Sequence, residues 1–421
     1  MSPTFRSLRV RNYRLFAIGQ VVSNTGTWMQ RVAQDWLVLE LTHSGTALGI
    51  TIGLQFLPLL LFGLWGGVIA DRYSKRTLLI GTQAAMGVLA LLLGVLDLAG
   101  VVQVWHVYLL AFGLGLATAL DNPARQSFVM EMVGPDDLSN AVSLNSATFN
   151  FARVMGPAVA GLLVTMAGTG PVFLINAASY LAVILSLARM RTGELRLQPP
   201  VPREKGQLRD GLRYVAGSPK LLLPIIIVGF VGTFGMNFQL TMALFAKNVF
   251  GKGPEAFGLL SSALALGALM GALLSARRGR PDPALLVGAA VTFGVLEVVT
   301  GLMPTYWSFA ALLVPTGLAL LTLNTAANAT TQLNSDPAMR GRVMSLYMLV
   351  FLGGTPLGAP VIGWVAEQFG PRWSLLVGGA VSAVASVVAA LVLARRNGTV
   401  IRMRLRPRPY VRVGAPEEMA S

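Results

Sequence analysis

The segment Gly67-Val-Ile-Ala-Asp71-Arg72-Tyr-Ser-Lys75-Arg76 is a short charged stretch between two long apolar blocks. The block before it begins near Thr46, and the block after it runs from Leu78 to Leu98. Each is long enough to cross the roughly 30 Å hydrocarbon core of a bilayer, which takes about 20 helical residues. The segment therefore predicts a turn between two membrane-spanning helices.

The composition of the whole chain agrees with this interpretation. Hydrophobic residues make up 54% of the 421 residues and charged residues only 12%, whereas about a quarter of the residues of a soluble domain are charged. Twelve apolar blocks of spanning length follow one another, so the predicted fold is an all-α membrane protein with twelve transmembrane helices. The predicted helices are 14–41, 46–70, 77–99, 104–122, 139–166, 171–190, 220–249, 254–276, 283–303, 306–331, 339–367 and 371–394.

Basic residues lie almost wholly on one side of this predicted arrangement. The net charge is +15, yet only Lys247, Lys252 and Arg372 of the 33 basic residues fall in the loops of the other side. This positive-inside pattern predicts a multi-pass protein of the cell (inner or plasma) membrane with both termini in the cytoplasm. The lipid bilayer therefore accounts for the charge, and no nucleic-acid partner is expected. No cleavable signal peptide is expected either, because residues 1–14 are polar and basic.

Several kinds of chemistry are excluded by residue usage. The chain has no cysteine, and its two histidines, His43 and His106, are far apart in the sequence, so neither a metal nor a cofactor is expected. A GxxxxGK[ST] nucleotide loop is absent, as are the clustered ligands or the nucleophile and base that a membrane enzyme would need. The chain is therefore not expected to be an enzyme.

The predicted helices form two halves that repeat each other. The polar, proline-containing linker 191–219 separates an N-terminal half, 1–190, from a C-terminal half, 220–394, and a basic cytoplasmic tail follows at 395–421. Parallel six-helix repeats are typical of alternating-access transporters with a site between the halves. Matching positions lie 202 to 207 residues apart: Gly63 and Gly67 match Gly267 and Gly271, Leu78–Gly81 matches Leu285–Gly288, and Ser143, Gly156 and Gly161 match Ser345, Gly358 and Gly363.

The charged segment 67–76 resembles the cytoplasmic signature loop of the major facilitator superfamily, with Ser74 where that family usually has glycine. In that family the loop latches the cytoplasmic gate, and its aspartate faces the start of the eleventh helix, here 340–342. A purely topogenic basic loop is the alternative. Acidic and basic residues at the inner end of the fourth helix are expected to form salt bridges with this loop. The resemblance implies a gate formed by Gly67, Asp71, Arg72, Arg76, Asp121 and Arg125.

The fifth predicted helix contains Gly156-Pro157-Ala158-Val159-Ala160-Gly161, which is similar to the glycine–proline motif of drug:proton antiporters. Small residues permit close packing, and Pro157 can kink the helix. The resemblance favours export over import, with a plain kink as the alternative. Over residues 5–394 the chain resembles the branch of the superfamily that contains enterobactin exporters and macrolide-efflux proteins. The usual arginine motif of the fourth helix is absent from 108–113.

Polar residues recur at helical spacing inside several predicted spans. Such residues are costly in lipid, so a polar stripe usually lines a wet cavity or a helix contact. In the major facilitator fold the first, fourth, seventh and tenth helices line the cavity, with the fifth beside it. The cavity-lining candidates are Gln20, Asn24, Thr27 and Gln34 in the first helix, Asn150 and Arg153 in the fifth, and Asn237 in the seventh.

Two charged residues beside the first stripe are candidates for proton coupling. Arg31 and Asp35 are four residues apart, close enough to pair on a helix. Burial favours a neutral carboxyl and a nearby cation favours the charged form, so a change in access can switch the proton. A structural ion pair, or charges reaching the outer interface, is the alternative. Glu297 in the ninth predicted helix ranks below them as a further candidate.

These features predict a secondary transporter that works by alternating access. The leading hypothesis is proton-coupled export of a small amphipathic compound such as a drug, a siderophore or a metabolite. An importer of a small solute with the same fold is the first alternative, and a polytopic membrane enzyme is the second. The expected partners are a small-molecule substrate, protons and the lipid bilayer, and the protein is expected to act as a monomer.

Overall fold

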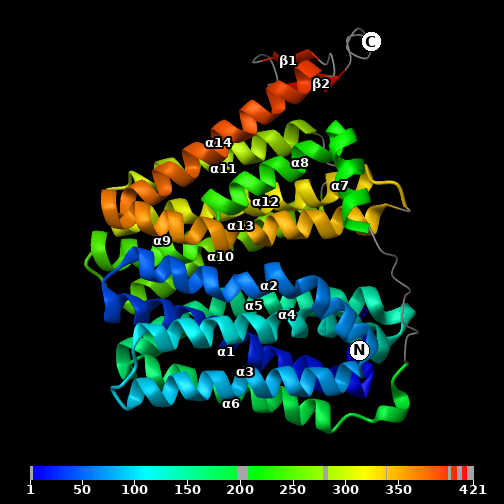
Figure 1. The fold of residues 1–421 in the computed structure, drawn as a ribbon, viewed down its shortest axis with the longest axis vertical. Coiled ribbons are helices and arrows are strands. Elements are labelled where there is room, and N and C mark those ends of the chain that lie inside the picture. The colour runs from blue at the N-terminus through cyan, green and yellow to red at the C-terminus, as the bar shows by residue number, and fades with distance from the viewer. Residues whose placement is uncertain are drawn as a thin grey trace. The chain divides into compact units, whose positions relative to one another are not determined.

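The structure, a computed structural model, is built almost entirely of helices (Figure 1). It describes residues 3–196, 207–277, 283–337, 339–396, 400–404 and 410–414. The long helices are α1 (Arg11–Thr42), α2 (Gly45–Arg72), α3 (Lys75–Leu98), α4 (Val104–Val133), α5 (Pro135–Ala167), α6 (Thr169–Ala188), α10 (Pro254–Ala276), α11 (Pro283–Gly301), α12 (Tyr306–Leu333), α13 (Arg340–Phe369) and α14 (Pro371–Arg396).

Shorter elements complete the described chain. They are the 3₁₀ turns η1 (Pro3–Arg9) and η2 (Thr192–Glu194), the helices α7 (Gln207–Gly217), α8 (Pro219–Phe230) and α9 (Phe238–Leu244), the π-helical turns η3 (Val231–Gly235) and η4 (Phe245–Val249), and the strands β1 (Val400–Arg404) and β2 (Tyr410–Gly414).

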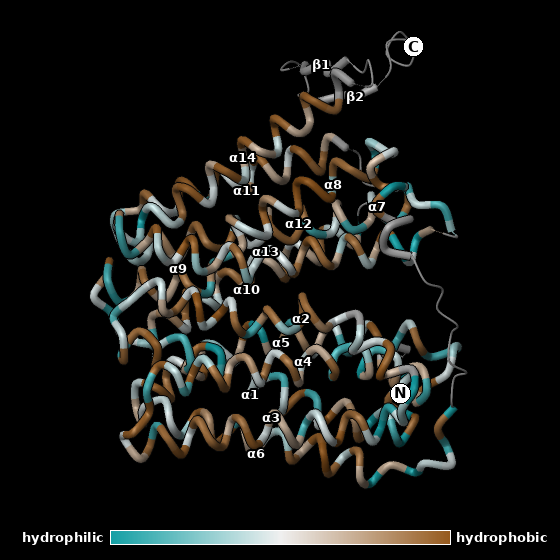
Figure 2. The backbone as a smooth tube through the Cα atoms, viewed as in Figure 1, coloured by the Kyte–Doolittle hydropathy of each residue, from teal (hydrophilic) through white to brown (hydrophobic). Residues whose placement is uncertain are grey.

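The predicted membrane spans are present as helices. Within the described residues, 11 helices are long and apolar enough to cross a membrane, and Figure 2 shows hydrophobic residues along their length. The 32-residue α1 is long enough but is not one of them, because polar residues recur along it. Counted with α1, the helices are consistent with the twelve predicted spans, and the protein is a multi-pass membrane protein.

The seventh predicted span differs from the others because its helix changes pitch twice. It runs from Pro219 to Val249 as α8, η3, α9 and η4. At the end of η3 the Met236 N–H donates to the Val231 carbonyl, five residues back, over 2.9 Å. π-Helical turns are rare and frequently lie at functional sites. The sequence predicted one continuous helix here and missed these two turns.

Most connections between the long helices are short. Gly134, at φ +72°, separates α4 from α5, and Gly168, at φ +81°, separates α5 from α6. Both positions lie in the left-handed region, which glycine adopts without steric cost. Pro135 then occupies the first turn of α5, where its missing N–H has no helical partner to lose. These turns make α4, α5 and α6 consecutive hairpins.

The chain forms two compact units. The first comprises Met1–Arg203 and Gln239–Ala265, and the second comprises Glu204–Phe238 and Leu266–Ser421. In the first unit α2 packs on α4, α3 on α6, and α1 on both α5 and α6; in the second, α11 packs on α12 and α14, and α13 packs on η3. The halves inferred from the repeat, 1–190 and 220–394, remain a prediction.

Glycine allows close helix contact in both units. In the first unit, a Cβ atom at Gly66 of α2 would collide with the backbone of Ala119 in α4. In the second, a Cβ atom at Gly267 of α10 would collide with the backbone of Val314 in α12. Small residues at such crossings let the backbones approach, which favours helix association in a membrane.

Parts of the linker and tail are more regular than the sequence indicated. Within the predicted linker, α7 packs on α13, and the Tyr214 hydroxyl donates to the Asp336 carboxylate over 2.8 Å. No proline interrupts this helix, because Pro199, Pro200 and Pro202 precede it in the sequence and Pro219 follows it. In the predicted tail, β1 and β2 pair antiparallel, with Val400 opposite Gly414. The rest of the linker, 197–206, and the tail residues 397–399, 405–409 and 415–421 lie outside the described residues.

Candidate functional site

The polar stripe predicted on the first helix lies along α1 and is largely buried. Gln20 and Gln34 are buried, whereas Asn24 and Thr27 are partly exposed. Two members reach other helices of the first unit. The Gln20 Oε1 atom accepts a hydrogen bond from Arg125 of α4, and the Thr27 hydroxyl lies 3.4 Å from that of Tyr180 in α6. Part of the stripe therefore mediates helix packing.

Asp35, beside this stripe, is fully buried and bonds to the seventh span. Its Oδ2 atom accepts a 2.6 Å hydrogen bond from Nε2 of Gln239 in α9. Its Oδ1 atom has no hydrogen-bond partner among the described residues. The carboxyl group thus joins α1 to α9 through one oxygen and leaves the other available.

Arg31 does not form the ion pair with Asp35 that their spacing suggested. Its guanidinium lies 4.7 Å from the ring centre of Trp28 and 5.9 Å from that of Phe56, and its buried Nε atom has no partner in the described chain. A cation over an aromatic face is attracted by the ring quadrupole. Two aromatic faces therefore hold Arg31, while Gln239 holds Asp35, and within the described residues no ion pair joins the two charges.

A second contact, one turn further along α1, reinforces the joint with the seventh span. The Lys247 ammonium of η4 donates to the Leu39 carbonyl over 2.8 Å and lies 5.5 Å from the Trp36 ring centre. The Trp36 indole N–H in turn donates to Glu40 over 2.7 Å. The C-terminal part of α1 therefore binds α9 and η4 at successive turns, and all of these residues belong to the first unit.

The polar stripe on α5 carries a second cation, Arg153, which is partly exposed but has buried donor atoms. The Nε and Nη2 atoms of Arg153 are buried without a partner in the described chain. Asn150 donates to the Ser146 carbonyl of its own helix over 2.8 Å. A turn beyond Arg153, a Cβ atom at Gly156 would lie 2.6 Å from the Trp28 Cβ atom, so α1 and α5 touch here. Arg153 therefore lies near the aromatic residue that holds Arg31.

The glycine–proline motif packs against α10 as well as α1. A Cβ atom at Gly161 would lie 2.7 Å from the Pro254 carbonyl oxygen, and Gly258 lies against the Pro157 carbonyl. The Ser262 hydroxyl donates to the Val154 carbonyl over 2.6 Å, and the Thr165 hydroxyl donates to Glu255 over 2.7 Å. The motif is therefore a helix-crossing surface, in addition to any kink that Pro157 introduces.

Asp121 and Arg125 form a buried network that differs from the expected one. Arg125 pairs with Asp121 one turn before it, and the Asp121 carboxylate also accepts from Thr82 over 2.8 Å and from Gln83 over 2.9 Å. With the bond from Arg125 to Gln20, this network ties α1, α3 and α4 together. The expected salt bridges to segment 71–76 are absent from the described residues, because buried side chains of α3 and α1 satisfy both charges.

The cations of segment 67–76 have other partners. Lys75 pairs with the buried Glu131 carboxylate over 2.6 Å. Arg76 donates to the Leu187 carbonyl over 2.7 Å and to the Ala188 carbonyl over 3.2 Å, at the end of α6. Cations are favourable at a helix C-terminus, where carbonyl groups have no helical partner. Asp71 belongs to α2, but its side chain lies outside what the structure describes, and the latch remains a prediction.

The remaining candidates lie in the second unit. Asn237 follows η3 and is buried; its Nδ2 atom donates to the Thr233 carbonyl over 2.9 Å, and its Oδ1 atom has no partner in the described chain. Glu297 of α11 is 1% exposed, and its Oε2 atom likewise has none. Asn237 therefore fixes the backbone at the end of η3, whereas Glu297 is a buried acid far along the chain from Asp35.

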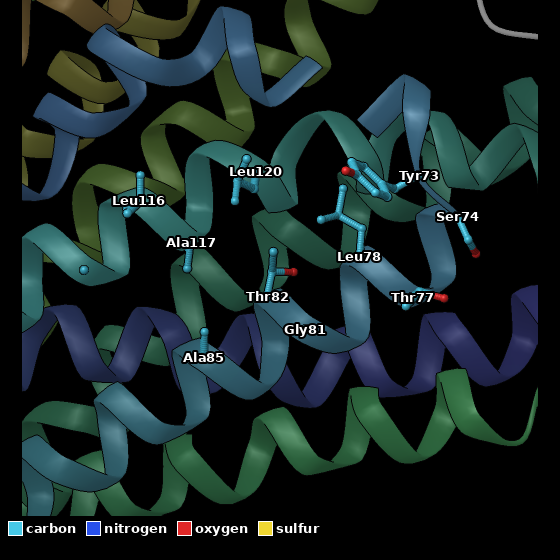
Figure 3. Close-up of a pocket in the computed structure, with 11 residues that line it drawn as sticks. Tyr73, Ser74, Thr77, Leu78, Gly81, Thr82, Ala85, Leu116, Ala117 and Leu120 are labelled. Carbon is cyan, nitrogen blue, oxygen red and sulfur yellow. The ribbon is translucent and has the colours of Figure 1, made fainter. Parts of the chain in front are cut away.

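A cavity of about 600 Å³ lies between α3 and α4, and Thr82, a partner of Asp121, is part of its wall (Figure 3). Leu78, Leu116 and Leu120 contribute to a mostly apolar wall. The wall contains none of the candidate proton-coupling or cavity-lining residues. The cavity and the polar site on α1 are therefore different places.

Comparison with known proteins identifies the class and then the family. The fold is that of the major facilitator superfamily: a bacterial homologue of the human lysosomal transporter Spinster, solved in an inward-facing, unoccupied conformation, matches with a TM-score of 0.69 at 16% identity, over 94% of this chain and 96% of that one. The superfamily's model for transmembrane secretion effectors matches residues 2–406. The chain belongs to that family and is a transporter, not an enzyme.

Two curated relatives are similar over nearly their full length. The macrolide efflux protein A of Streptococcus pyogenes is 24% identical over 391 residues, covering 91% of this chain and 96% of that protein. The enterobactin exporter of Citrobacter koseri is 25% identical over 409 residues, covering 96% of this chain and 95% of that protein.

Sequence reasoning missed the partners of the charged residues. Gln239, Trp28 and Lys247 hold Asp35, Arg31 and the end of α1, but none was a candidate. Gln239 did carry a signal, since it is a polar residue inside a strongly apolar span. The sequence also indicated Trp28, because it lies one turn from Arg31 on the same predicted helix.

We predict that Asp121→Asn destabilises the protein far more than Asp137→Asn. Removing the Asp121 charge leaves the partly buried Arg125 without its anion, and breaking a buried pair costs about 3–5 kcal/mol. Asp137 also pairs with an arginine, Arg6, but that arginine is half exposed, and surface pairs contribute little. Thermal unfolding of both purified variants in detergent measures the difference. Equal unfolding temperatures for the two variants would contradict the assigned network.

Proposed function

We propose that the protein exports small amphipathic compounds in exchange for protons, by alternating access. The observation that carries this proposal is the buried Asp35 carboxyl, held by Gln239 through one oxygen and free at the other. Two relatives named for efflux, of a macrolide and of enterobactin, support outward transport. The glycine–proline motif supports it as well, by its resemblance to that of drug:proton antiporters.

Proton exchange at Asp35 would act on the joint between α1 and α9. A hydrogen bond to a charged carboxylate is roughly twice as strong as one to a neutral group. Protonation therefore weakens the bond from Gln239, and deprotonation strengthens it. A ligand shifts a conformational equilibrium only by binding its states differently, and a proton on Asp35 would do so through this bond. Arg31, one turn away, favours the charged carboxylate without bonding to it.

The free polar atoms on α1 and α5 indicate the substrate chemistry. Apart from Asp35 Oδ1, they are all N–H donors, so a ligand that satisfies them supplies acceptor oxygens. Trp28 offers an aromatic face beside these donors for the apolar part of the ligand. An amphipathic, oxygen-rich compound fits both. The donor atoms are Gln20 Nε2, Gln34 Nε2, Arg31 Nε, Arg153 Nε and Arg153 Nη2.

The driving force is sufficient for uphill export. One proton moving inward gains about 2.3 kcal/mol per 100 mV of membrane potential, and a pH gradient adds to it. Import by the same fold is the alternative, which the direction of flux in oriented vesicles distinguishes.

Asp35→Asn is expected to abolish uphill, uncoupler-sensitive efflux while leaving downhill exchange of substrate intact. The asparagine amide has the same shape as the carboxyl group but cannot exchange a proton. The variant should therefore lose proton coupling and still bind substrate. Asp97→Asn is the matched control, because Asp97 lies at the end of α3, where it bonds to Thr169. Transport of a fluorescent substrate into everted vesicles, with and without an uncoupler, separates the two activities. Uphill transport by a folded Asp35→Asn protein would exclude Asp35 as the coupling site.

We propose that both termini and the linker 191–219 are cytoplasmic, on the strength of the charge asymmetry. The cysteine-free chain allows single cysteines to report topology. Cysteines placed at Gly206 and Ser421 should react with a membrane-impermeant maleimide only after the cells are opened, whereas a cysteine at Lys252 should react in intact cells. Labelling of either of the first two in intact cells would reverse the proposed orientation.

We propose that Asp71 stabilises the closed state of the cytoplasmic gate, as its resemblance to the family signature implies. Asp71→Asn should slow transport at least tenfold with normal expression and unfolding temperature, because the change biases one conformation without opening a core cavity. The exposed Asp136, at the start of α5, provides the Asp136→Asn control, which should transport normally. A normal rate in Asp71→Asn would leave segment 67–76 with only a topogenic role.

A further inference from the structure

A second buried polar cluster lies in the second unit, around the π-helical turn of the seventh span. Its members come from η3, α11 and α14, which pack on one another. Glu297 is 1% exposed and Ser382 is fully buried. The Glu297 Oε2 atom and the Ser382 hydroxyl have no hydrogen-bond partner among the described residues. This cluster is separate from Asp35, which belongs to the first unit.

Two glycines show how closely the oxygen atoms converge. A Cβ atom at Gly378 would lie 2.6 Å from the Phe234 carbonyl oxygen and 2.7 Å from Glu297 Oε1. A Cβ atom at Gly235 would lie 2.5 Å from the Ser382 hydroxyl and 3.1 Å from Glu297 Oε2. Neither glycine has room for a side chain, so the helices pack closely here, and oxygen atoms from different helices border both positions, with the Phe293 ring beside them at Gly235.

No cation balances the Glu297 carboxylate within the described residues. No ion pair includes it, and α12, which packs against α11, carries no charged residue. Arg372, at the start of α14, donates to the carbonyls of Gly301 and Met303. The side chains of the other charged residues on the packed elements, Arg395, Arg396 and Arg412, lie outside the described part of the chain. An uncompensated buried carboxylate is very costly, so either a proton or a bound cation must neutralise it.

We propose that Glu297, Ser382 and the Phe234 carbonyl form a binding site for a sodium ion. Hard monovalent and divalent cations take oxygen ligands, and carbonyls at interrupted transmembrane helices coordinate sodium in other transporters. A proton would require only one acceptor, whereas four oxygen atoms border these two glycines: two from a carboxylate, one from a hydroxyl and one from the Phe234 carbonyl, which also accepts from Asn237 over 3.2 Å. The ion would neutralise Glu297 and fix the backbone of η3.

The site goes beyond proton-coupled export and does not depend on it. Its position matters because η3 belongs to the seventh span, whose α9 segment carries Gln239, the partner of Asp35. Sodium at Glu297 would stabilise the π-helical turn between α8 and α9. A test on purified protein, without transport, keeps its outcome independent of the proposed export function.

The test measures thermal unfolding of purified protein in detergent as sodium chloride replaces potassium chloride at constant ionic strength and pH. A ligand that binds only the folded state raises the unfolding temperature as its concentration exceeds its dissociation constant. The wild-type protein should therefore show a saturable upward shift with sodium. Glu297→Gln should abolish the shift and Ser382→Ala should weaken it, while Asp35→Asn should retain it.

A glycine pair supplies a matched control in which no ligand residue is replaced. The methyl group of Gly378→Ala would lie within 3 Å of the Phe234 carbonyl oxygen and Glu297 Oε1, so it must displace at least one of them and should abolish the sodium shift, whereas Gly288→Ala, on α11, meets nothing within 4 Å and should retain it. If Glu297→Gln does not fold, the wild-type titration and the two glycine variants still show whether sodium binds at this site. The absence of a sodium-dependent shift in the wild type would overturn the proposal, as would a full shift in Gly378→Ala. Stabilisation by acid pH alone would overturn it too, because it would assign a proton to Glu297.

Discussion

The dominant constraint on this molecule is that a polar group inside the hydrocarbon core has no water to bond with. Each such group must be satisfied by another part of the protein or by a ligand. The helix with the most polar residues, α1, is therefore also one of the most enclosed, with α5 and α6 packed along it. Asp35 and Gln20 each form a hydrogen bond with a residue more than a hundred positions away in the sequence.

The same constraint separates structural polar residues from functional ones. Both carboxylate oxygens of Asp121 have partners, in Arg125, Thr82 and Gln83, and its network ties three helices together. Asp35 and Glu297 each keep an oxygen without a partner among the described residues, and Arg153 keeps two nitrogens. A charged group with a structural role has all its hydrogen-bond partners within the protein. A charged group that exchanges protons, binds ions or contacts substrate must keep at least one atom without a protein partner. The incompletely bonded groups are therefore the ones to which we assign function.

Much of the fold could be predicted from the sequence because each membrane-spanning helix is a long, mostly apolar segment. Most span boundaries, such as Lys75–Leu98 for the predicted 77–99, agree within a few residues, since hydropathy over about 20 residues averages out local ambiguity. The prediction 104–122 was too short, because α4 continues through polar residues to Val133. The partners of the buried charges could not be predicted. Spacing placed Arg31 near Asp35, but whether they bond depends on Trp28, Phe56 and Gln239, and only the packing of the helices decides that. The π-helical turn at η3 could not be predicted either, because its sequence does not differ from that of an ordinary apolar helix.

Export driven by an inward proton movement is the central claim, and flux in everted membrane vesicles tests it most directly. In these vesicles the outer face of the transporter faces the lumen, so an acid lumen reproduces the cellular proton gradient. We expect an oxygen-rich amphipathic substrate to accumulate in the lumen above its external concentration when the gradient is imposed, without any nucleotide. Collapse of the gradient by an uncoupler should release it. Accumulation that persists after the uncoupler, or uphill uptake only into right-side-out vesicles, would contradict proton-driven export.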